Sequence, residues 1–231
     1  MATIELDDVT VTAPTADGEV VLLRDVTARL TERRVVVVGA NGSGKSTLVR
    51  LVNGLVAAAS GTVRVDGLDV ATDGPAVRRR VGFVFTQPAA QLVMPTVLED
   101  VALSLRRHVK DKREREARAR AVLAEIGLAD RADTSVHALS GGQQQLLAIA
   151  GVLACEPTVV VADEPTTLLD RANTRRVGDT LFGLDQQLVL VTHDLDLAAR
   201  CDRVLVVDAA RVVADGAPAD SIAHYTGLVD R

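Results

Sequence analysis

A glycine-rich stretch of the sequence has the composition of a phosphate-binding loop. GANGSGKST, from Gly39 to Thr47, fits the pattern G-x-x-x-x-G-K-[ST] and lies between an apolar run and a segment typical of a helix. In such a loop the glycines let backbone N–H groups surround phosphate oxygens, the lysine reaches the β- and γ-phosphates, and the next hydroxyl binds Mg²⁺. We therefore expect a nucleotide to bind at Gly39, Ala40, Asn41, Gly42, Ser43, Gly44, Lys45, Ser46 and Thr47, with Ser46 also binding the metal.

A second stretch ends in two acids. TVVVADE, from Thr158 to Glu164, contains an apolar run that predicts a strand, and Asp163 and Glu164 stand at its end. Paired acids after a strand more often form a turn or cap a helix. Beside a phosphate loop, however, they suit catalysis, because Asp163 can bind Mg²⁺ and Glu164 can polarise the attacking water.

A third stretch, LSGGQ from Leu139 to Gln143, opens a segment that is predicted to be helical over residues 140–154. The backbone N–H groups and the dipole of its first turn suit an anion. No lysine or arginine accompanies them between Leu139 and Pro157. Because the chain already has one complete phosphate loop, this helix end is explained if it closes over the γ-phosphate bound by a second copy. We therefore expect a head-to-tail dimer with two shared sites.

Short apolar runs alternate with loops and helical segments, and these elements must position the three stretches. Strands are predicted at Ile4–Val11, Val20–Leu30 (as a pair), Val35–Val38, Thr62–Val65, Val81–Phe85, Val159–Ala162, Leu188–Thr192 and Val204–Val207. This alternation predicts a mostly parallel α/β sheet with sites at the carboxyl ends of its strands. The composition changes between residues 88 and 156, where the charge-rich segment Arg106–Leu128 indicates inserted helices. Glu114 and Arg118 are spaced i,i+4 in this segment, so we expect them to form an ion pair on a helix surface.

Composition limits the classes of partner. The chain has 231 residues, of which 48% are hydrophobic and only 2% aromatic, so its core must consist of valine, leucine and alanine. The formal net charge of −5 argues against a general nucleic-acid binder. No stretch approaches the ~18 apolar residues of a membrane-spanning helix. Cys155 and Cys201 lack the spacing of a metal or redox site, and we expect reduced thiols.

The motifs and their order resemble those of ATP-binding cassette ATPases over essentially the whole chain. TLLD at Thr167–Asp170 is similar to the family's loop that communicates across the dimer, and His193 in LVLVTHDLD is similar to its switch histidine. The resemblance implies an ATP hydrolase that uses ATP and Mg²⁺, with Glu164 and His193 as catalytic residues. It also implies a joint nucleotide site to which the second chain contributes Ser140, Gly141, Gly142, Gln143 and Asp170.

The same resemblance implies the fold. We expect a P-loop NTPase (RecA-like) α/β core with an antiparallel β edge and an inserted α-helical subdomain. Residues 1–231 would form a single ATPase domain, with its core at about 1–87 and 157–231 and its helical subdomain at about 88–156.

Residues Val81–Leu105 narrow the resemblance to one group of importers. VGFVFTQPAAQLVMPTVLEDVALSL is similar to V-G-x-V-F-Q-[ND]-P-x-x-Q followed by T-V-x-E-D-V-A in energy-coupling-factor importers of vitamins, cobalt or nickel, and lies nearest to the biotin importers. This implies a transmembrane scaffold subunit whose coupling helix enters a groove around Gln91–Glu99, a membrane substrate-binding subunit, and a cytoplasmic position on the inner face of the cell membrane. The alternative is a soluble ATPase switch that regulates a protein or nucleic-acid partner, because it shares every nucleotide motif.

The sequence departs from the family pattern at three places. Thr86 stands where the family has glutamine, and Gln87 follows one place later; since one residue along a strand reverses the face, both remain candidates for the magnesium site. The family's adenine-stacking aromatic is missing near Ala13, so we expect adenine to lie on an aliphatic residue, Val20 or Leu22, with weak discrimination between ATP and GTP. Leu146 replaces a residue that is often basic in relatives.

Overall fold

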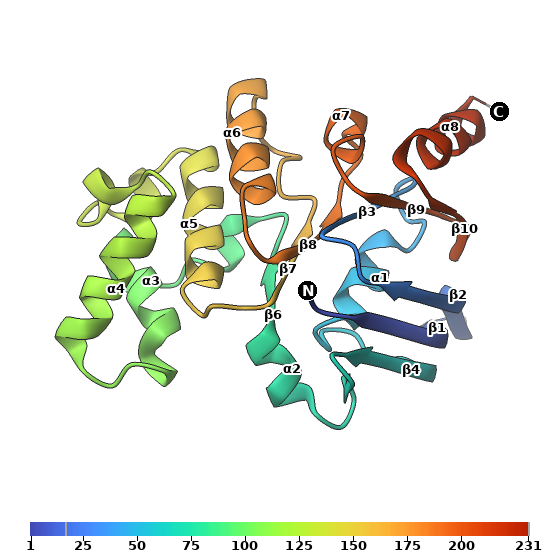
Figure 1. Cartoon of the computed structure of the whole chain (residues 1–231), viewed down its shortest axis with the longest axis horizontal. Helices are drawn as coiled ribbons and strands as arrows, with labels where there is room; N and C mark the ends of the chain where they lie inside the picture. The colour runs from blue at the N-terminus through green and yellow to red at the C-terminus, as the bar shows by residue number, and fades with distance from the viewer. Residues whose placement is uncertain (17, 231) are drawn as a thin grey trace.

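The strands form two sheets in a computed structural model that describes residues 1–16 and 18–230 (Figure 1). The first sheet is antiparallel, in the order β2-β1-β4-β5. The second has the order β10-β9-β3-β8-β7-β6, and all its neighbours run parallel except β10 and β9. Their bounds are β1 (Ile4–Thr15), β2 (Gly18–Leu30), β3 (Arg34–Val38), β4 (Ser60–Val65), β5 (Leu68–Asp69), β6 (Val81–Val84), β7 (Val159–Asp163), β8 (Gln187–Val191), β9 (Arg203–Asp208) and β10 (Arg211–Gly216).

The larger sheet is buried on both faces, as its all-apolar runs predict. Along β3, Val36 and Val38 face one apolar cluster while Val35 and Val37 face the other. The first cluster is covered by helices, and the second fills the space toward the antiparallel sheet. The carboxyl ends of the parallel strands therefore form an edge on which loops can carry a site.

Helices cover the larger sheet on both faces. Val49 and Leu51 of α1 (Lys45–Leu51) pack in the cluster between the two sheets. The helices α6 (Arg171–Phe182), α7 (Leu195–Ala198) and α8 (Pro218–Val229) follow one another along the opposite face (Figure 1). The short helix α2 (Gly74–Arg80) precedes β6.

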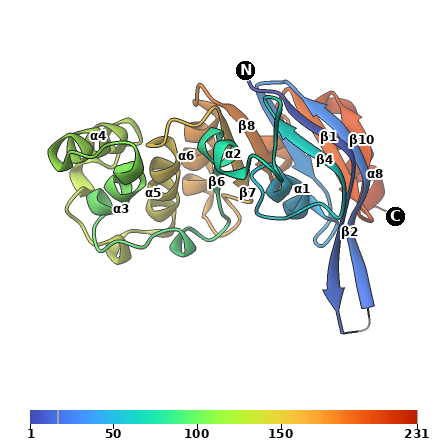
Figure 2. The same cartoon turned by 90° about the horizontal axis from the view of Figure 1, so that it is seen from below.

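A group of helices lies at one end of the molecule, away from the antiparallel sheet (Figures 1 and 2). It contains α3 (Val97–Ser104), α4 (Lys112–Glu125) and α5 (Gly141–Leu153), with 3-10 turns at η1 (Pro88–Ala90), η2 (Leu105–Arg107), η3 (Ala129–Arg131) and η4 (Val136–Ala138). The charge-rich segment is not one helix from Arg106, because Asp111 caps a new helix by accepting the N–H of Glu114 at 2.8 Å. The expected Glu114–Arg118 pair forms at 2.7 Å.

The antiparallel sheet differs from expectation in one respect. Val20–Leu30 is not a pair of strands but part of the single strand β2, which pairs with β1 along its length. The register shifts between Leu6 and Thr12, and Asp8 and Asp25 have φ of 49°. These irregularities are bulges, which bend and twist the pair while the chain stays in one strand. The paired ends of β1 and β2 project from the body (Figure 2).

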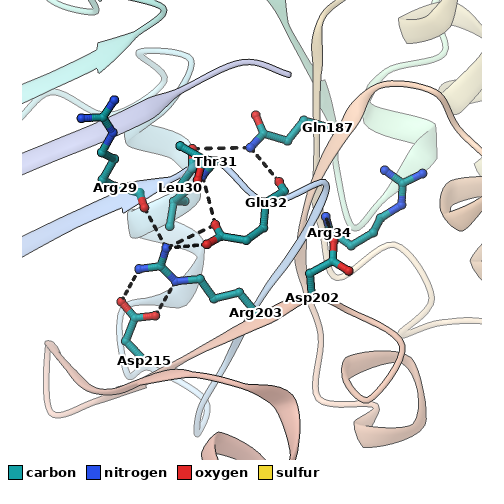
Figure 3. Close-up of polar contacts among 9 residues, drawn as sticks. All are labelled: Arg29, Leu30, Thr31, Glu32, Arg34, Gln187, Asp202, Arg203 and Asp215. Atoms are coloured by element: carbon teal, nitrogen blue, oxygen red, sulfur yellow. Dashed lines mark hydrogen bonds and ion pairs between the residues drawn. The ribbon is translucent and has the colours of Figure 1, made fainter.

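An ion-pair network ties strands together where β3, β8 and β9 begin (Figure 3). The guanidinium of Arg203 donates to Asp215 at 2.6 and 2.7 Å, to Glu32 at 3.1 and 3.2 Å, and to the carbonyl of Arg29 at 2.7 Å. Because Arg29 belongs to β2, the network connects the two sheets. It lies at the edge opposite the carboxyl ends of the parallel strands.

Candidate active site

The glycine-rich loop joins the end of β3 to α1, as predicted. A Cβ at Gly39, which has φ of 154°, would lie 2.1 Å from the carbonyl oxygen of Val207. A Cβ at Gly44, which has φ of 113°, would lie 2.7 Å from the carbonyl oxygen of Leu22. Only glycine meets both demands, a close approach of backbones and a positive φ. The loop is therefore held between β9 and β2.

Lys45 lies on the inner side of this loop. Its ammonium donates to the carbonyl oxygens of Gly39 at 2.9 Å and Ala40 at 2.8 Å, and the residue is buried. Burial lowers the pKa of Lys45, while the carboxylates of Glu164 and Asp163 act to raise it. These two hydrogen bonds hold the ammonium against the loop, and Lys45 lines the cavity in which a phosphate could be bound.

Asp163 ends β7 and is completely buried. Its Oδ1 accepts the hydroxyl of Ser46 at 2.7 Å, and its Oδ2 accepts the guanidinium of Arg50 at 2.9 Å. Thr86 donates its hydroxyl to the backbone carbonyl of Asp163 at 2.8 Å. The adjacent hydroxyl and carboxylate of Ser46 and Asp163 are hard oxygen donors, the type that Mg²⁺ prefers.

These donors suit a metal that is bound together with a nucleotide. In residues 1–16 and 18–230, no group of three or more His, Cys, Asp or Glu side chains is placed to hold an ion. Mg²⁺ typically binds through one or two protein oxygens plus substrate phosphates and water. Ser46 and Asp163 fit that arrangement.

Glu164 has the unusual backbone conformation often found at active sites. Its φ of 51° is in the left-handed region, and its N–H donates to Val191 at 3.0 Å. The carboxylate oxygen Oε2 accepts the hydroxyl of Thr167 at 2.5 Å and lies 2.8 Å from Nδ1 of His193. The structure therefore brings the two predicted catalytic residues into direct contact, from the ends of β7 and β8.

A cavity of about 690 Å³ collects most of these groups; buried Asp163 does not line it but accepts a hydrogen bond from Ser46, which does. Thr86 borders this cavity, and Thr86 and Gln87 both border a separate groove of about 280 Å³ that also meets Gly141 and Leu168. The two candidates for the metal thus differ in that Thr86 lines the larger cavity and Gln87 does not, and a magnesium role for either residue stays a prediction. The cavity is lined by Leu22, Gly39, Ala40, Asn41, Gly42, Gly44, Lys45, Ser46, Thr47, Thr86, Glu164, Thr167, His193 and Tyr225.

Two of its lining residues bear on the missing adenine-stacking aromatic. Of the two aliphatic candidates, Leu22 lines the cavity, while Val20 is exposed on β2 outside it. Tyr225, the only tyrosine of the chain, reaches the cavity from α8. Sequence reasoning missed Tyr225 because its approach depends on the order of strands β3, β9 and β10, which periodicity does not reveal.

The LSGGQ helix end lies elsewhere. Ser140 and Gly141 are exposed, and neither borders the cavity that contains Lys45. Ser140 caps α5: its hydroxyl accepts the N–H of Gln143 at 3.4 Å, and Gln143 Oε1 accepts the N–H of Ser140 at 2.9 Å. In this structure the side chain of Gln143, expected to bind nucleotide, is thus part of a capping box.

The loop of Asp170 is packed against this helix end. Asp170 caps α6 and accepts the backbone N–H of Asn173 at 2.9 Å and its amide at 2.8 Å. These hydrogen bonds lower the pKa of Asp170. A Cβ at Gly142 would lie 2.3 Å from Oδ1 of Asn173, so the two helix starts touch only because residue 142 is glycine.

Several residues of the segment Val81–Leu105, which is similar to importer ATPases, form hydrogen bonds within that segment. Gln91 accepts the N–H of Phe85 at 2.8 Å and donates to the carbonyl of Phe83 at 3.0 Å. Buried Asp100 accepts the N–H groups of Val93 and Met94 at 2.8 and 2.9 Å. Thr96 and Glu99 form the capping box of α3, and the side chain of Val93 is exposed in the loop that precedes this helix.

Leu146 is explained by its place in α5, where it is fully buried in the helical apolar cluster. A basic side chain at that position would lack water and a partner. Cys155 and Cys201 are free thiols, and burial raises the pKa of Cys155 and raises that of Cys201 to about 12.

Comparison with known proteins places the chain in a family. Residues 23–167 match the family described as ABC transporter. The biotin transport ATP-binding protein BioM of Rhizobium etli is 42% identical over 208 residues, 90% of this chain and 92% of that protein. The chain therefore belongs to the ABC transporter family and is an ATP-hydrolysing component.

Solved structures agree with this assignment. The dimeric ATP-binding cassette MJ0796, bound to ADP and Pi, gives a TM-score of 0.83 at 30% identity, covering 93% of this chain and 98% of that one. Clostridium perfringens cbiO1, part of the transporter complex cbiONQ, also gives 0.83 at 29% identity, covering 98% and 93%. These findings confirm the P-loop NTPase fold and the resemblance to ATPases of energy-coupling-factor importers. In residues 1–16 and 18–230, no helix is long and apolar enough to cross a membrane.

Proposed function

We propose that two copies of this chain, or one copy and a similar ATPase, close around ATP and Mg²⁺ to power import of a small nutrient. A vitamin, biotin above all, is favoured as the cargo by the BioM relative, and cobalt or nickel is the other option. The partners would be a transmembrane scaffold subunit and a membrane substrate-binding subunit. The ATPase would then work in the cytoplasm, on the inner face of the cell membrane.

Each residue of the site has a part in hydrolysis. The N–H groups of the 39–47 loop and Lys45 would bind the β- and γ-phosphates. Ser46 and Asp163 would hold Mg²⁺, which neutralises charge on the phosphates when bound. Glu164 would orient and deprotonate the attacking water, and His193, already in contact with Glu164, would fix the geometry at the γ-phosphate.

The observation that carries the proposal is the separation of the two phosphate-binding elements. Lys45, Glu164 and His193 line one cavity, while Ser140 stands on an exposed helix start outside it. The capping box occupies the N–H groups of Ser140 and Gln143 and leaves those of Gly141 and Gly142, which suit an anion supplied from outside the chain. Ser140, Gly141 and Gly142 would therefore complete the site of the opposing chain, and Asp170, packed against them, would lie at the same contact.

Trapping the closed dimer tests this proposal. Removal of a general base costs about 10²–10⁴ in rate, so Glu164→Gln should hydrolyse ATP at least ~100-fold more slowly while still binding it. With ATP and Mg²⁺ it should become dimeric by light scattering, and ADP should leave it monomeric. Adding Ser140→Arg, which places a long charged side chain on the helix start, should abolish the dimer without abolishing nucleotide binding. A Glu164→Gln protein that binds ATP and stays monomeric would refute the shared site.

The membrane partners need a separate experiment. Pull-down of the chain from detergent-solubilised membranes should recover integral membrane proteins, and Val93→Glu in the exposed loop should reduce that recovery. Recovery of soluble proteins alone would favour the regulatory switch instead.

A further inference from the structure

The acid at the end of β7 has a positively charged neighbour that the proposed mechanism does not use. Arg50, on the last turn of α1, approaches Oδ2 of Asp163 to 2.9 Å, while Ser46 takes Oδ1. The Arg50 side chain is 41% exposed and that of Asp163 is fully buried. Nε of Arg50 is buried and makes no hydrogen bond to residues 1–16 or 18–230. The guanidinium is therefore held at Asp163 by this one contact, at the cost of an unpaired donor.

A buried carboxylate is expensive to keep charged without a partner. Lys45 is not in direct contact with the carboxylate of Asp163 in the structure, and its ammonium donates to the carbonyls of Gly39 and Ala40. Arg50 is the cation that touches Asp163. It approaches Oδ2, the oxygen that Ser46 does not use, so Oδ1 stays paired with the hydroxyl of Ser46, a residue that lines the cavity.

We propose that Arg50 balances the charge of Asp163 before the metal binds, and that its positive charge opposes the binding of Mg²⁺. This inference rests on the proposed function, in which Ser46 and Asp163 hold Mg²⁺ with the nucleotide. Arg50 stabilises the empty site by compensating Asp163. Once a divalent cation arrives, Asp163 has a second positive partner, and the two cations repel each other. Arg50 thereby makes the free protein more stable and the metal less tightly bound.

This trade-off predicts opposite changes in two quantities when the charge is removed. Arg50→Met keeps the aliphatic length and loses the guanidinium. The free protein should melt at a lower temperature, and saturating Mg²⁺ with ATP should close most of that gap to the parent protein. The Mg²⁺ concentration for half-maximal binding of a fluorescent ATP analogue should fall by at least about threefold, because one repelling charge has gone.

A matched control distinguishes this from simple loss of an ion pair. Arg200 has the same 41% exposed side chain and approaches Asp179 at 2.9 Å, but Asp179 is 59% exposed. Neither Arg200 nor Asp179 lines the cavity. Arg200→Met should lower the melting temperature by an amount that Mg²⁺ and ATP do not change, and it should leave the Mg²⁺ requirement of nucleotide binding unaltered.

The experiment uses Glu164→Gln as the parent, so that ATP is not consumed. Arg50→Lys, which keeps the charge, should keep the Mg²⁺ requirement within about twofold. If Arg50→Met does not fold, Arg50→Gln compared with Arg50→Lys gives the same contrast. The proposed role of Arg50 is overturned if the uncharged variant needs as much Mg²⁺ as the parent, or more, while the parent itself binds the analogue in a Mg²⁺-dependent way. A parent that binds the analogue equally with and without Mg²⁺ overturns the proposed magnesium site itself.

Discussion

Removal of Arg203 should destabilise the fold while sparing the nucleotide site. Its guanidinium joins Asp215, Glu32 and the carbonyl of Arg29 (Figure 3). Arg203→Ala would leave two carboxylates facing each other without their common partner. The contact lies at the edge of the sheet opposite the phosphate loop, so binding of an ATP analogue should stay unchanged.

The magnitude follows from the degree of burial. Arg203 is 20% exposed, and its partners Glu32 and Asp215 are 31% and 28% exposed. Breaking a fully buried pair costs about 3–5 kcal/mol and an exposed pair about 0–1 kcal/mol, so we expect a loss of about 2–3 kcal/mol. For a chain of 231 residues this corresponds to a fall in melting temperature of roughly 5–10 °C.

A neighbouring pair provides the control. Arg211 approaches Asp25 at 2.9 Å, but the two side chains are 48% and 52% exposed. Arg211→Ala should therefore cost less than about 1 kcal/mol in urea unfolding. The reasoning is refuted if Arg203→Ala costs no more than Arg211→Ala.

The lowered pKa of Glu32 determines how the stability difference between the parent protein and Arg203→Ala depends on pH. Burial acts to raise the pKa of Glu32, but hydrogen bonds from the Thr31 and Glu32 backbone and the charge of Arg203 outweigh it, and the pKa is lowered from 4.5. A carboxyl whose pKa is depressed on folding contributes stability above its unfolded pKa and loses it as pH falls through the folded value. The gap between the parent and Arg203→Ala should therefore be full at neutral pH and shrink below about pH 4.5.

Two further predictions concern the nucleotide site. Gly142→Ala places a Cβ 2.3 Å from Asn173 Oδ1, so the start of α5 must move; ATP-dependent dimerisation of the Glu164→Gln protein should weaken at least ~10-fold. Adding Asn173→Ala should restore part of it, and no recovery would show that the clash is not the cause. Tyr225→Ala should weaken binding of fluorescent ATP about 3–10-fold. Tyr225→Phe should bind it normally, because the aromatic ring can stack on the base and the tyrosine hydroxyl is not needed for stacking. Since stacking on Tyr225 or Leu22 does not read base edges, ATP and GTP should compete within about threefold, and strong preference for ATP would contradict this contact.

The features that the sequence predicts well are those decided within a few residues. Four consecutive valines indicate a strand buried on both faces, and β3 is one. The positive φ of the glycines at 39 and 44 is a local demand that makes the loop recognisable from its own residues, whereas the close approach of Val207 and Leu22 appears only in the fold. The Ser140–Gln143 capping box was not predicted, because Gln143 was assigned to the nucleotide, although S-x-x-Q before an apolar run is the pattern of such a box.

The features that the sequence does not predict depend on how distant strands are ordered. Tyr225 reaches a loop about 180 residues earlier because β10 returns antiparallel beside β9 and places α8 next to that loop. Arg50 meets Asp163 for a similar reason, as α1 contacts β7 only once the sheet has formed. The register between Thr86 and Gln87 is likewise decided by how the chain leaves β6.

One continuous segment connects Glu164, the proposed catalytic residue, to the helix start that we propose completes the site of the opposing chain. Glu164 accepts the hydroxyl of Thr167 at 2.5 Å, and a few residues later Asp170 holds Asn173 at 2.8 Å. Asn173 in turn is packed against Gly142, where a single added carbon would not fit. A change in the contacts of the Glu164 carboxylate, such as the arrival of the γ-phosphate and water, must therefore alter the hydrogen bond to Thr167 at one end of a short, capped segment. Because tightly packed contacts shift as a unit rather than stretch, we expect the other end, the start of α5, to respond. The two sites of the proposed dimer would then be linked through residues 164–173.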